Sequence, residues 1–219
     1  VPKFINYYEM VLHAFHLDHQ WQATVGSIFA LILITTIGLI YKSQVEKAGD
    51  DVAPASKFGI RFLLEKILDF VYSLARDNCG KEYRKYFPLM AAIFIYVLVC
   101  NLSGMVPGFP PPTESMDTNL AMGIMVFLAY NLAGLKEHGG VGYLKTFMGP
   151  VVLIAPLFFA IEMVSHASRP LSLSVRLMGN IFADHTLVGV FTSLSVTQFL
   201  LPSVLMFFGL MVAVVQSFV

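Results

Sequence analysis

Arg176 is the residue in this sequence whose chemistry is most constrained by its surroundings. From position 146 onward the only formal charges are Glu162, Arg169, Arg176 and Asp184, and apolar residues dominate the rest. An arginine near the centre of a bilayer costs about 2.5–3.5 kcal/mol on insertion scales, and its guanidinium stays protonated at physiological pH. We therefore expect Arg176 to meet an anionic partner or to act as a charge barrier, because it is a poor proton carrier.

Polar residues recur around Arg176 at helical spacing. Ser172, Arg176 and Asn180 are four residues apart, so on a helix they form one polar stripe. Glu162 lies about 40° from Arg176 around a straight helix, and His185 lies on the opposite face. The helix thus presents a fixed cation on one side and a titratable group on another.

Asp184 and His185 form a pair that could hold and pass protons. Imidazole titrates near neutral pH, and burial can raise the pKa of a carboxylate toward that range. A simpler interpretation stays open on composition alone, in which Glu162 or Asp184 neutralises Arg176 only to let the helices fold.

The composition identifies the class of protein that must position these residues. Of the 219 residues, 57% are hydrophobic and 13% charged, and the mean hydropathy is +0.72. Soluble domains carry about 25% charged residues, so we expect an all-α polytopic protein of the lipid bilayer. The net charge of zero argues against a nucleic-acid partner. Cys79 and Cys100 cannot form a disulfide framework.

The first part of the chain contains three apolar segments of membrane length and one amphipathic segment. Transmembrane helices are expected at 21–41, 86–106 and 119–136. At 57–77, apolar residues recur at helical spacing and charged residues take the other face, which predicts an interfacial amphipathic helix.

The last part of the chain is too long for a single upright span. One helix over 147–195 would measure ~73 Å, more than twice the ~30 Å hydrocarbon core. Hydropathy alone allows two passes or one long, strongly tilted helix, with Pro156 and Pro170 expected to kink it. A final helix is expected at 198–219, continuing past Val219.

The basic residues give a consistent orientation. The segment 42–85 holds nine of the fourteen Lys and Arg residues, and Lys136 and Lys145 bracket 136–145, whereas 107–118 has acidic residues and no basic ones. By the positive-inside rule, 42–85 and 136–145 lie inside, and 107–118 and the N-terminus lie outside.

Several classes of site are not expected. The sequence has no phosphate-binding loop, paired-cysteine motif or nucleophile elbow, so we expect no cofactor and no nucleotide chemistry. His13, His16 and His19 do not share one helix face, which argues against a metal site. Asn101 and Asn131 are expected to form hydrogen bonds between helices.

The segment around Arg176 closely resembles the signature of subunit a of F-type ATP synthases. The matching run, residues 168–185, reads SRPLSLSVRLMGNIFADH. The similarity extends to the glutamate-containing segment 161–165, to the outer loop 112–119 and to the final segment 215–219, which reads VQSFV.

This resemblance implies a specific role. Subunit a is the non-catalytic membrane stator beside a rotating ring of c subunits, and peripheral-stalk b subunits are its other partners. Two offset half-channels for protons meet near the arginine, which would be Arg176. Asn180 and Gln216 would match polar residues near it, with Ser172 as a supporting polar group. Glu162 and His185 would match proton-handling positions, and the last two long helices would lie tilted against the ring.

Two positions depart from the family pattern. Many bacterial members carry glutamate where this chain has His185, and Asp184 stands beside it. Some relatives have an ionisable residue at the position of Gly209. The resemblance and the short loops favour the bacterial inner membrane. The alternatives are a self-contained ion channel or secondary transporter, and a non-transporting membrane scaffold.

Overall fold

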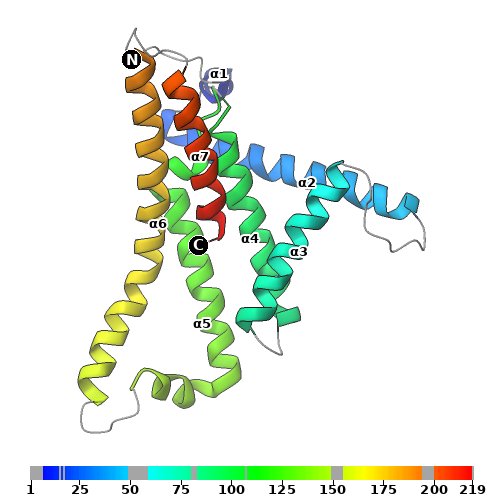
Figure 1. Cartoon of the computed structure of the whole chain (residues 1–219). Helices are drawn as coiled ribbons and strands as arrows, with labels where there is room; N and C mark the ends of the chain where they lie inside the picture. Colours follow the sequence, from blue (N-terminus) through cyan, green and yellow to red (C-terminus); the bar gives the residue numbers. More distant parts are fainter. Residues whose placement is uncertain are drawn as a thin grey trace. The chain divides into compact units, whose positions relative to one another are not determined.

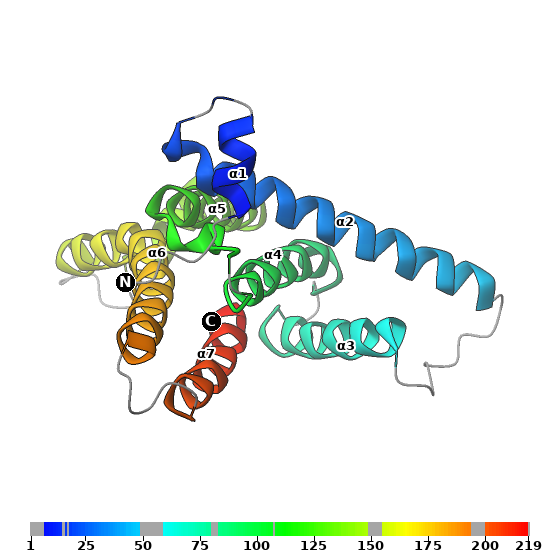
Figure 2. The ribbon, with the colours of Figure 1, turned by 90° about the horizontal axis from the view of Figure 1, so that it is seen from above.

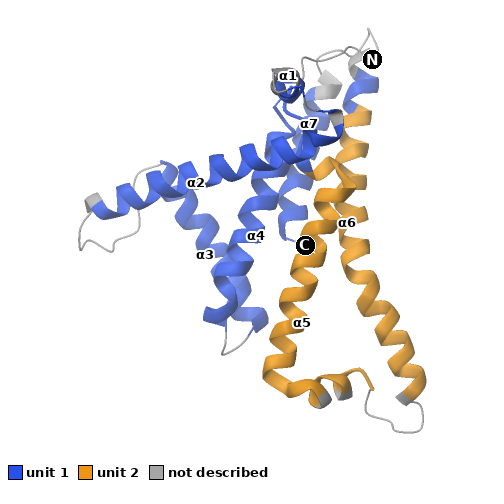
Figure 3. Cartoon of the chain, turned by 180° about the vertical axis from the view of Figure 1, so that it is seen from behind, with its two compact units in different colours: residues 1–112, 188–219 blue, residues 113–187 orange. Residues whose placement is uncertain are grey.

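The regular structure in the described part of the chain is helical. The computed structural model describes residues 7–14, 16, 18–48, 59–79, 83–106, 108–148, 155–193 and 200–218. Parts of the predicted segments 57–77, 147–195 and 198–219 therefore lie outside the described residues. The chain divides into two compact units, residues 1–112 with 188–219, and residues 113–187 (Figure 3).

The first unit contains the helices before and after the polar segment (Figure 1). Its elements are α1 (Tyr7–Ala14), η1 (His19–Trp21), α2 (Gln22–Ala48), α3 (Ile60–Cys79), α4 (Tyr83–Ser103) and α7 (Leu200–Phe218). A small hydrophobic core joins α3 to α4, formed by Val71, Ala91, Phe94 and Leu98.

The amphipathic helix α3 packs along α4, as seen from above in Figure 2. Its apolar side chains recur every three or four residues, so they share one face. Ile67, Leu68 and Val71 on that face contact the α4 side of the core. This contact covers part of the apolar stripe of α3, whereas Ile60 and Leu63 are 50% and 56% exposed. The position of α3 at the membrane surface remains a prediction.

Helix α7 is tied to α4 by a polar contact between apolar helices. The Asn101 side-chain amide donates a hydrogen bond to the carbonyl oxygen of Ala213 at 3.4 Å, and Asn101 is only 6% exposed. A buried amide needs such a partner, since an unpaired polar group among apolar helices is costly. The prediction of an interhelical hydrogen bond from Asn101 is thus confirmed.

The second unit is built from η3 (Pro112–Glu114) after Pro112, from α5 (Met116–Thr146) and from the part of α6 (Ala155–Ser193) up to Leu187. Helix α5 changes direction at Gly139, where φ is 70° and ψ is 163°. This left-handed backbone favours glycine because it has no Cβ. The stretch 136–145, which lies beyond the predicted transmembrane segment 119–136, is therefore helical on both sides of this bend.

Helix α6 is one continuous helix of 39 residues. From position 155 onward, the described part of the predicted segment 147–195 is thus a single helix, Ala155–Ser193, and its tilt in the membrane stays a prediction. Pro156 lies in the first turn of α6. Backbone N–H groups there have no intrahelical acceptor, so a proline costs no helical hydrogen bond. Pro170 lies inside the helix. At 1.5 Å per residue α6 is about 58 Å long, almost twice the thickness of a ~30 Å hydrocarbon core.

The outward surface of the helices is apolar, as lipid contact requires. Gln22–Glu46, Tyr83–Ser103 and Met116–Gly140 are long and apolar enough to cross a membrane. Large apolar side chains that face outward include Ile32, 60% exposed, and Val164, 72% exposed. Such a surface would aggregate in water. The chain is an all-α polytopic membrane protein.

Candidate functional site

The site begins with a close contact between α5 and α6. A Cβ atom placed on Gly123 would lie 3.0 Å from both the Pro170 carbonyl oxygen and the Ser174 hydroxyl oxygen. Ser174 is 1% exposed, and its hydroxyl donates a hydrogen bond to the Pro170 carbonyl oxygen at 2.7 Å. Glycine on α5 and a small residue on α6 allow this approach, as is common between membrane helices. The contact fixes which face of α6 meets α5.

Arg176 points away from that contact. It lies two residues after Ser174, which is about 200° around the helix. The Arg176 and Ser172 side chains are exposed and Asn180 is partly exposed, whereas Leu177 is 5% exposed. Within the described residues no acidic group forms an ion pair with Arg176. The polar stripe therefore lies on an outward face of α6, with its cation uncompensated by this unit.

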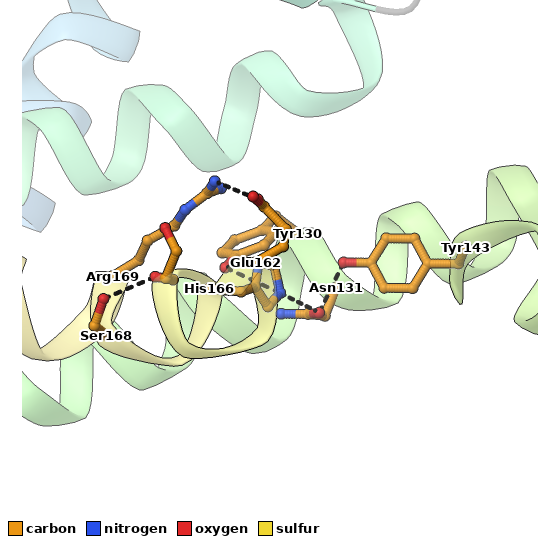
Figure 4. Close-up of polar contacts among 8 residues, drawn as sticks. Tyr130, Asn131, Tyr143, Glu162, His166, Ser168 and Arg169 are labelled. Atoms are coloured by element: carbon orange, nitrogen blue, oxygen red, sulfur yellow. Dashed lines mark hydrogen bonds and ion pairs between the residues drawn. The ribbon is translucent and has the colours of Figure 1, made fainter. Parts of the chain in front are cut away.

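Glu162 pairs with Arg169 and not with Arg176. If Glu162 only neutralised Arg176 for folding, the two would be expected to pair. Glu162 Oε1 lies 3.5 Å from a terminal guanidinium nitrogen of Arg169, seven residues later on the same helix (Figure 4). The side chains are 58% exposed for Arg169 and 44% exposed for Glu162, so the pair adds little stability. Glu162 remains accessible, and it offsets the charge of Arg169.

A buried histidine joins α5 to α6 beside this ion pair (Figure 4). His166 Nε2 lies 2.9 Å from the amide oxygen of Asn131, which also accepts a 2.8 Å hydrogen bond from the Tyr143 hydroxyl. Since the Asn131 amide group donates to the Phe127 carbonyl oxygen at 2.7 Å, its oxygen faces His166. Nε2 must then carry a proton. The predicted interhelical hydrogen bond of Asn131 is confirmed.

The register of these contacts shows how α5 and α6 run. Asn131 lies eight residues after Gly123, and His166 lies eight residues before Ser174. The two helices are therefore antiparallel along this contact. The same register brings the residues before α5 close to the C-terminal part of α6, where Asp184 and His185 lie.

His185 meets an acidic residue that the sequence did not single out. Its Nδ1 lies 3.6 Å from Oε2 of Glu114, in η3. The His185 side chain is 33% exposed and that of Glu114 38%, and Asp184 is partly buried beside them. The residues are separated by most of α5 and α6 in the chain, so no local pattern links them. The only signal in the sequence was that the segment 107–118 contains acidic residues and no basic ones.

Gln216 lies on α7 in the first unit and is partly buried. The other six predicted site residues, Glu162, Ser172, Arg176, Asn180, Asp184 and His185, lie on α6 in the second unit. Among the residues that the structure describes, no three His, Cys, Asp or Glu side chains gather as metal ligands.

These features define a class of membrane protein in which a long helix carries a fixed cation on one face and titratable groups on others. The family described as ATP synthase A chain matches residues 18–219, and the chain belongs to this family, that of ATP synthase subunit a. Subunit a of Bdellovibrio bacteriovorus is 41% identical over 202 residues, covering 92% of this chain and 86% of the relative.

Other bacterial relatives agree with this assignment. Subunit a 2 of Syntrophotalea carbinolica is 37% identical, with 93% of this chain and 80% of the relative covered. Subunit a of Geobacter sulfurreducens is 33% identical, with 99% and 90% covered.

Proposed function

We propose that this chain is the proton-conducting stator of a rotary ATP synthase in the bacterial inner membrane, with its N-terminus outside. It would work against a ring of c subunits, held by peripheral-stalk b subunits, and it would carry no nucleotide chemistry itself. Two half-channels, one open to each side, would bring protons to and from the ring. Membership of the ATP synthase subunit a family supports the proposal.

The observation that carries the proposal is the outward orientation of Arg176. Its side chain is exposed on α6, and Glu162 is occupied by Arg169 instead. A fixed cation facing lipid is costly, so an anion must approach from outside this chain. A ring carboxylate supplies that anion at the moment when it gives up its proton. Because guanidinium cannot release its proton, it favours the ionised carboxylate and does not conduct protons itself.

The remaining polar residues divide between the two half-channels in this proposal. Glu162 belongs to the inner one and the Asp184–His185 pair to the outer one. Ser172, Asn180 and Gln216 provide polar contacts along the face that meets the ring. Glu162 and His185 are 23 positions apart on one helix, which is about 35 Å along its axis. Arg176 lies between them, where it blocks direct passage from one half-channel to the other.

The test is ATP-driven proton pumping by the assembled complex in vesicles. Arg176→Ala should abolish pumping while the complex still assembles. The matched control is Ser103→Ala on α4, whose hydroxyl only donates a local hydrogen bond to the Cys100 carbonyl oxygen at 2.7 Å. Normal pumping by an assembled Arg176→Ala complex would show that the arginine is a folding residue, and it would contradict the proposal.

A further inference from the structure

We propose that Glu114 is a further proton-handling residue, which exchanges protons with His185 at the mouth of the outer half-channel. This inference rests on the proposed function, since it concerns the same pathway. It assigns a role to a residue of the short helix before α5, whereas the family signature lies on α6. The carrying observation is the 3.6 Å distance between Glu114 Oε2 and His185 Nδ1.

The geometry suits exchange between a carboxylate and an imidazole. A proton moves between such groups when they lie within hydrogen-bond reach or are bridged by one water, and these contacts often lengthen in resting structures. The two side chains are about one-third exposed, with values of 33% and 38%. Water can therefore reach both groups, but each is also held against protein. The step transfers one proton from the carboxylic acid of Glu114 to His185 and forms no covalent bond.

The backbone that carries Glu114 is firmly anchored. The Asn119 side-chain amide donates a 2.6 Å hydrogen bond to the carbonyl oxygen of Thr113. Thr113 is 0% exposed and Asn119 2% exposed, so both ends of this bond are enclosed. Thr113 directly precedes Glu114. The Asn119–Thr113 bond therefore fixes the backbone from which the Glu114 side chain extends to His185.

The helical register explains why His185 is within reach. It lies eleven residues after Ser174, which is about 20° around the helix from that residue. His185 is thus on the face of α6 that contacts α5, and this face is opposite Arg176. Glu114 lies nine residues before Gly123 on the antiparallel partner. The contact that points Arg176 outward therefore brings His185 to Glu114.

Asp184 is a less suitable partner for His185 than Glu114. Adjacent residues on a helix point about 100° apart, so neighbouring side chains do not face each other. Glu114 approaches from another element, and its Oε2 lies 3.6 Å from Nδ1. Glu114 also lies in the acidic segment 107–118, which lacks Lys and Arg. Protons that enter from the outer solution would therefore reach this acidic residue first.

The experiment compares ATP-driven proton pumping in vesicles that contain the assembled complex with Glu114→Gln or Glu114→Asp. Glutamine keeps the size and hydrogen-bonding ability of the side chain but cannot carry a proton, whereas aspartate keeps the carboxylate. We expect Glu114→Gln to lower the proton flux by about tenfold or more, which is less than the full rate effect of a typical general acid or base. Glu114→Asp should retain most of the wild-type flux. Asp117→Asn, an exposed acid in the same segment, is the matched control and should leave the flux unchanged.

A double variant separates this role from a structural one. If Glu114 acts through His185, adding Glu114→Gln to His185→Gln should cost little beyond His185→Gln alone. Full additivity, or a flux that survives in Glu114→Gln but falls in Glu114→Asp, would overturn the inference. Arg176→Ala is measured in the same vesicles. If it abolishes pumping while Glu114→Gln does not, only this inference fails; if neither variant affects pumping, the proposed function fails as well.

Discussion

Gly123 on α5 and Ser174 on α6 are in direct contact, so that a Cβ on Gly123 would lie 3.0 Å from the Ser174 hydroxyl oxygen. This contact determines the rotation of α6 about its own axis relative to α5. It turns Ser174 inward, Arg176 outward and His185 toward the start of α5. The orientation of the polar groups on α6 thus depends on the glycine at position 123 of α5, which has no side chain.

A larger residue at position 123 should separate the two helices. We expect Gly123→Leu to destabilise the protein by about 1–3 kcal/mol, as overpacked sites do, and to reduce proton pumping because Arg176 turns with α6. Thermal unfolding of the purified complex measures the first effect. The control is Gly38→Leu, since a Cβ at Gly38 has no neighbour within 4 Å. Equal stability of the two variants would show that the close contact does not matter.

Replacing Arg176 by lysine tests whether a permanent charge is needed. Lysine preserves the formal charge but can lose its proton in a dry site, whereas guanidinium cannot. We expect Arg176→Lys to impair ATP-driven pumping severely in vesicles with a fully assembled complex. Near-normal pumping by this variant would contradict the fixed-cation argument.

The two arginines of α6 should respond differently to the loss of their charge. Arg169 lies seven residues before Arg176 and is already paired with Glu162 at 3.5 Å. An exposed pair of this kind contributes about 0–1 kcal/mol, so Arg169→Gln should leave assembly intact and retain most of the proton flux. Arg176→Gln should abolish the flux. Comparable losses in both variants would mean that α6 needs its total charge and not one particular cation.

Replacing Asn131 should lower the stability of the folded protein, because one amide oxygen serves two donors. Its amide oxygen accepts hydrogen bonds from His166 at 2.9 Å and from Tyr143 at 2.8 Å. Asn131→Leu leaves the buried His166 and the partly buried Tyr143 without this acceptor, so we expect a loss of about 1–3 kcal/mol for a donor that stays buried and unpaired. Tyr143→Phe removes one donor only and should cost less. Unfolding midpoints of the two variants provide the comparison, and a larger loss in Tyr143→Phe would refute the shared-acceptor arrangement.

The sequence predicted those features that depend on local periodicity. The all-α membrane fold follows from long apolar segments, and the stripe of Ser172, Arg176 and Asn180 follows from their spacing of four on a helix. The interhelical hydrogen bonds of Asn101 and Asn131 could be expected because an amide in an apolar segment needs a partner. These inferences require only the residues of one helix.

Features that depend on two distant segments could not be predicted in this way. Glu114 lies near His185 only because α5 and α6 are antiparallel and in register, which no local pattern specifies. The bend at Gly139 depends on a φ of 70°, and a glycine alone does not reveal it. Hydropathy also could not show that α6 continues through Pro170, because an apolar segment of this length is compatible with two passes or with one long helix.

The orientation of the polar stripe can be tested most directly by disulfide cross-linking in the assembled complex. After Cys79 and Cys100 are replaced by alanine, Ser172→Cys and Ser174→Cys are each combined with a cysteine beside the ring carboxylate. Ser172 is exposed, whereas Ser174 is 1% exposed and contacts α5. We predict a cross-link to the ring from Ser172→Cys and none from Ser174→Cys. A cross-link from position 174 but not from 172 would mean that Arg176 faces away from the ring, and it would contradict the central claim.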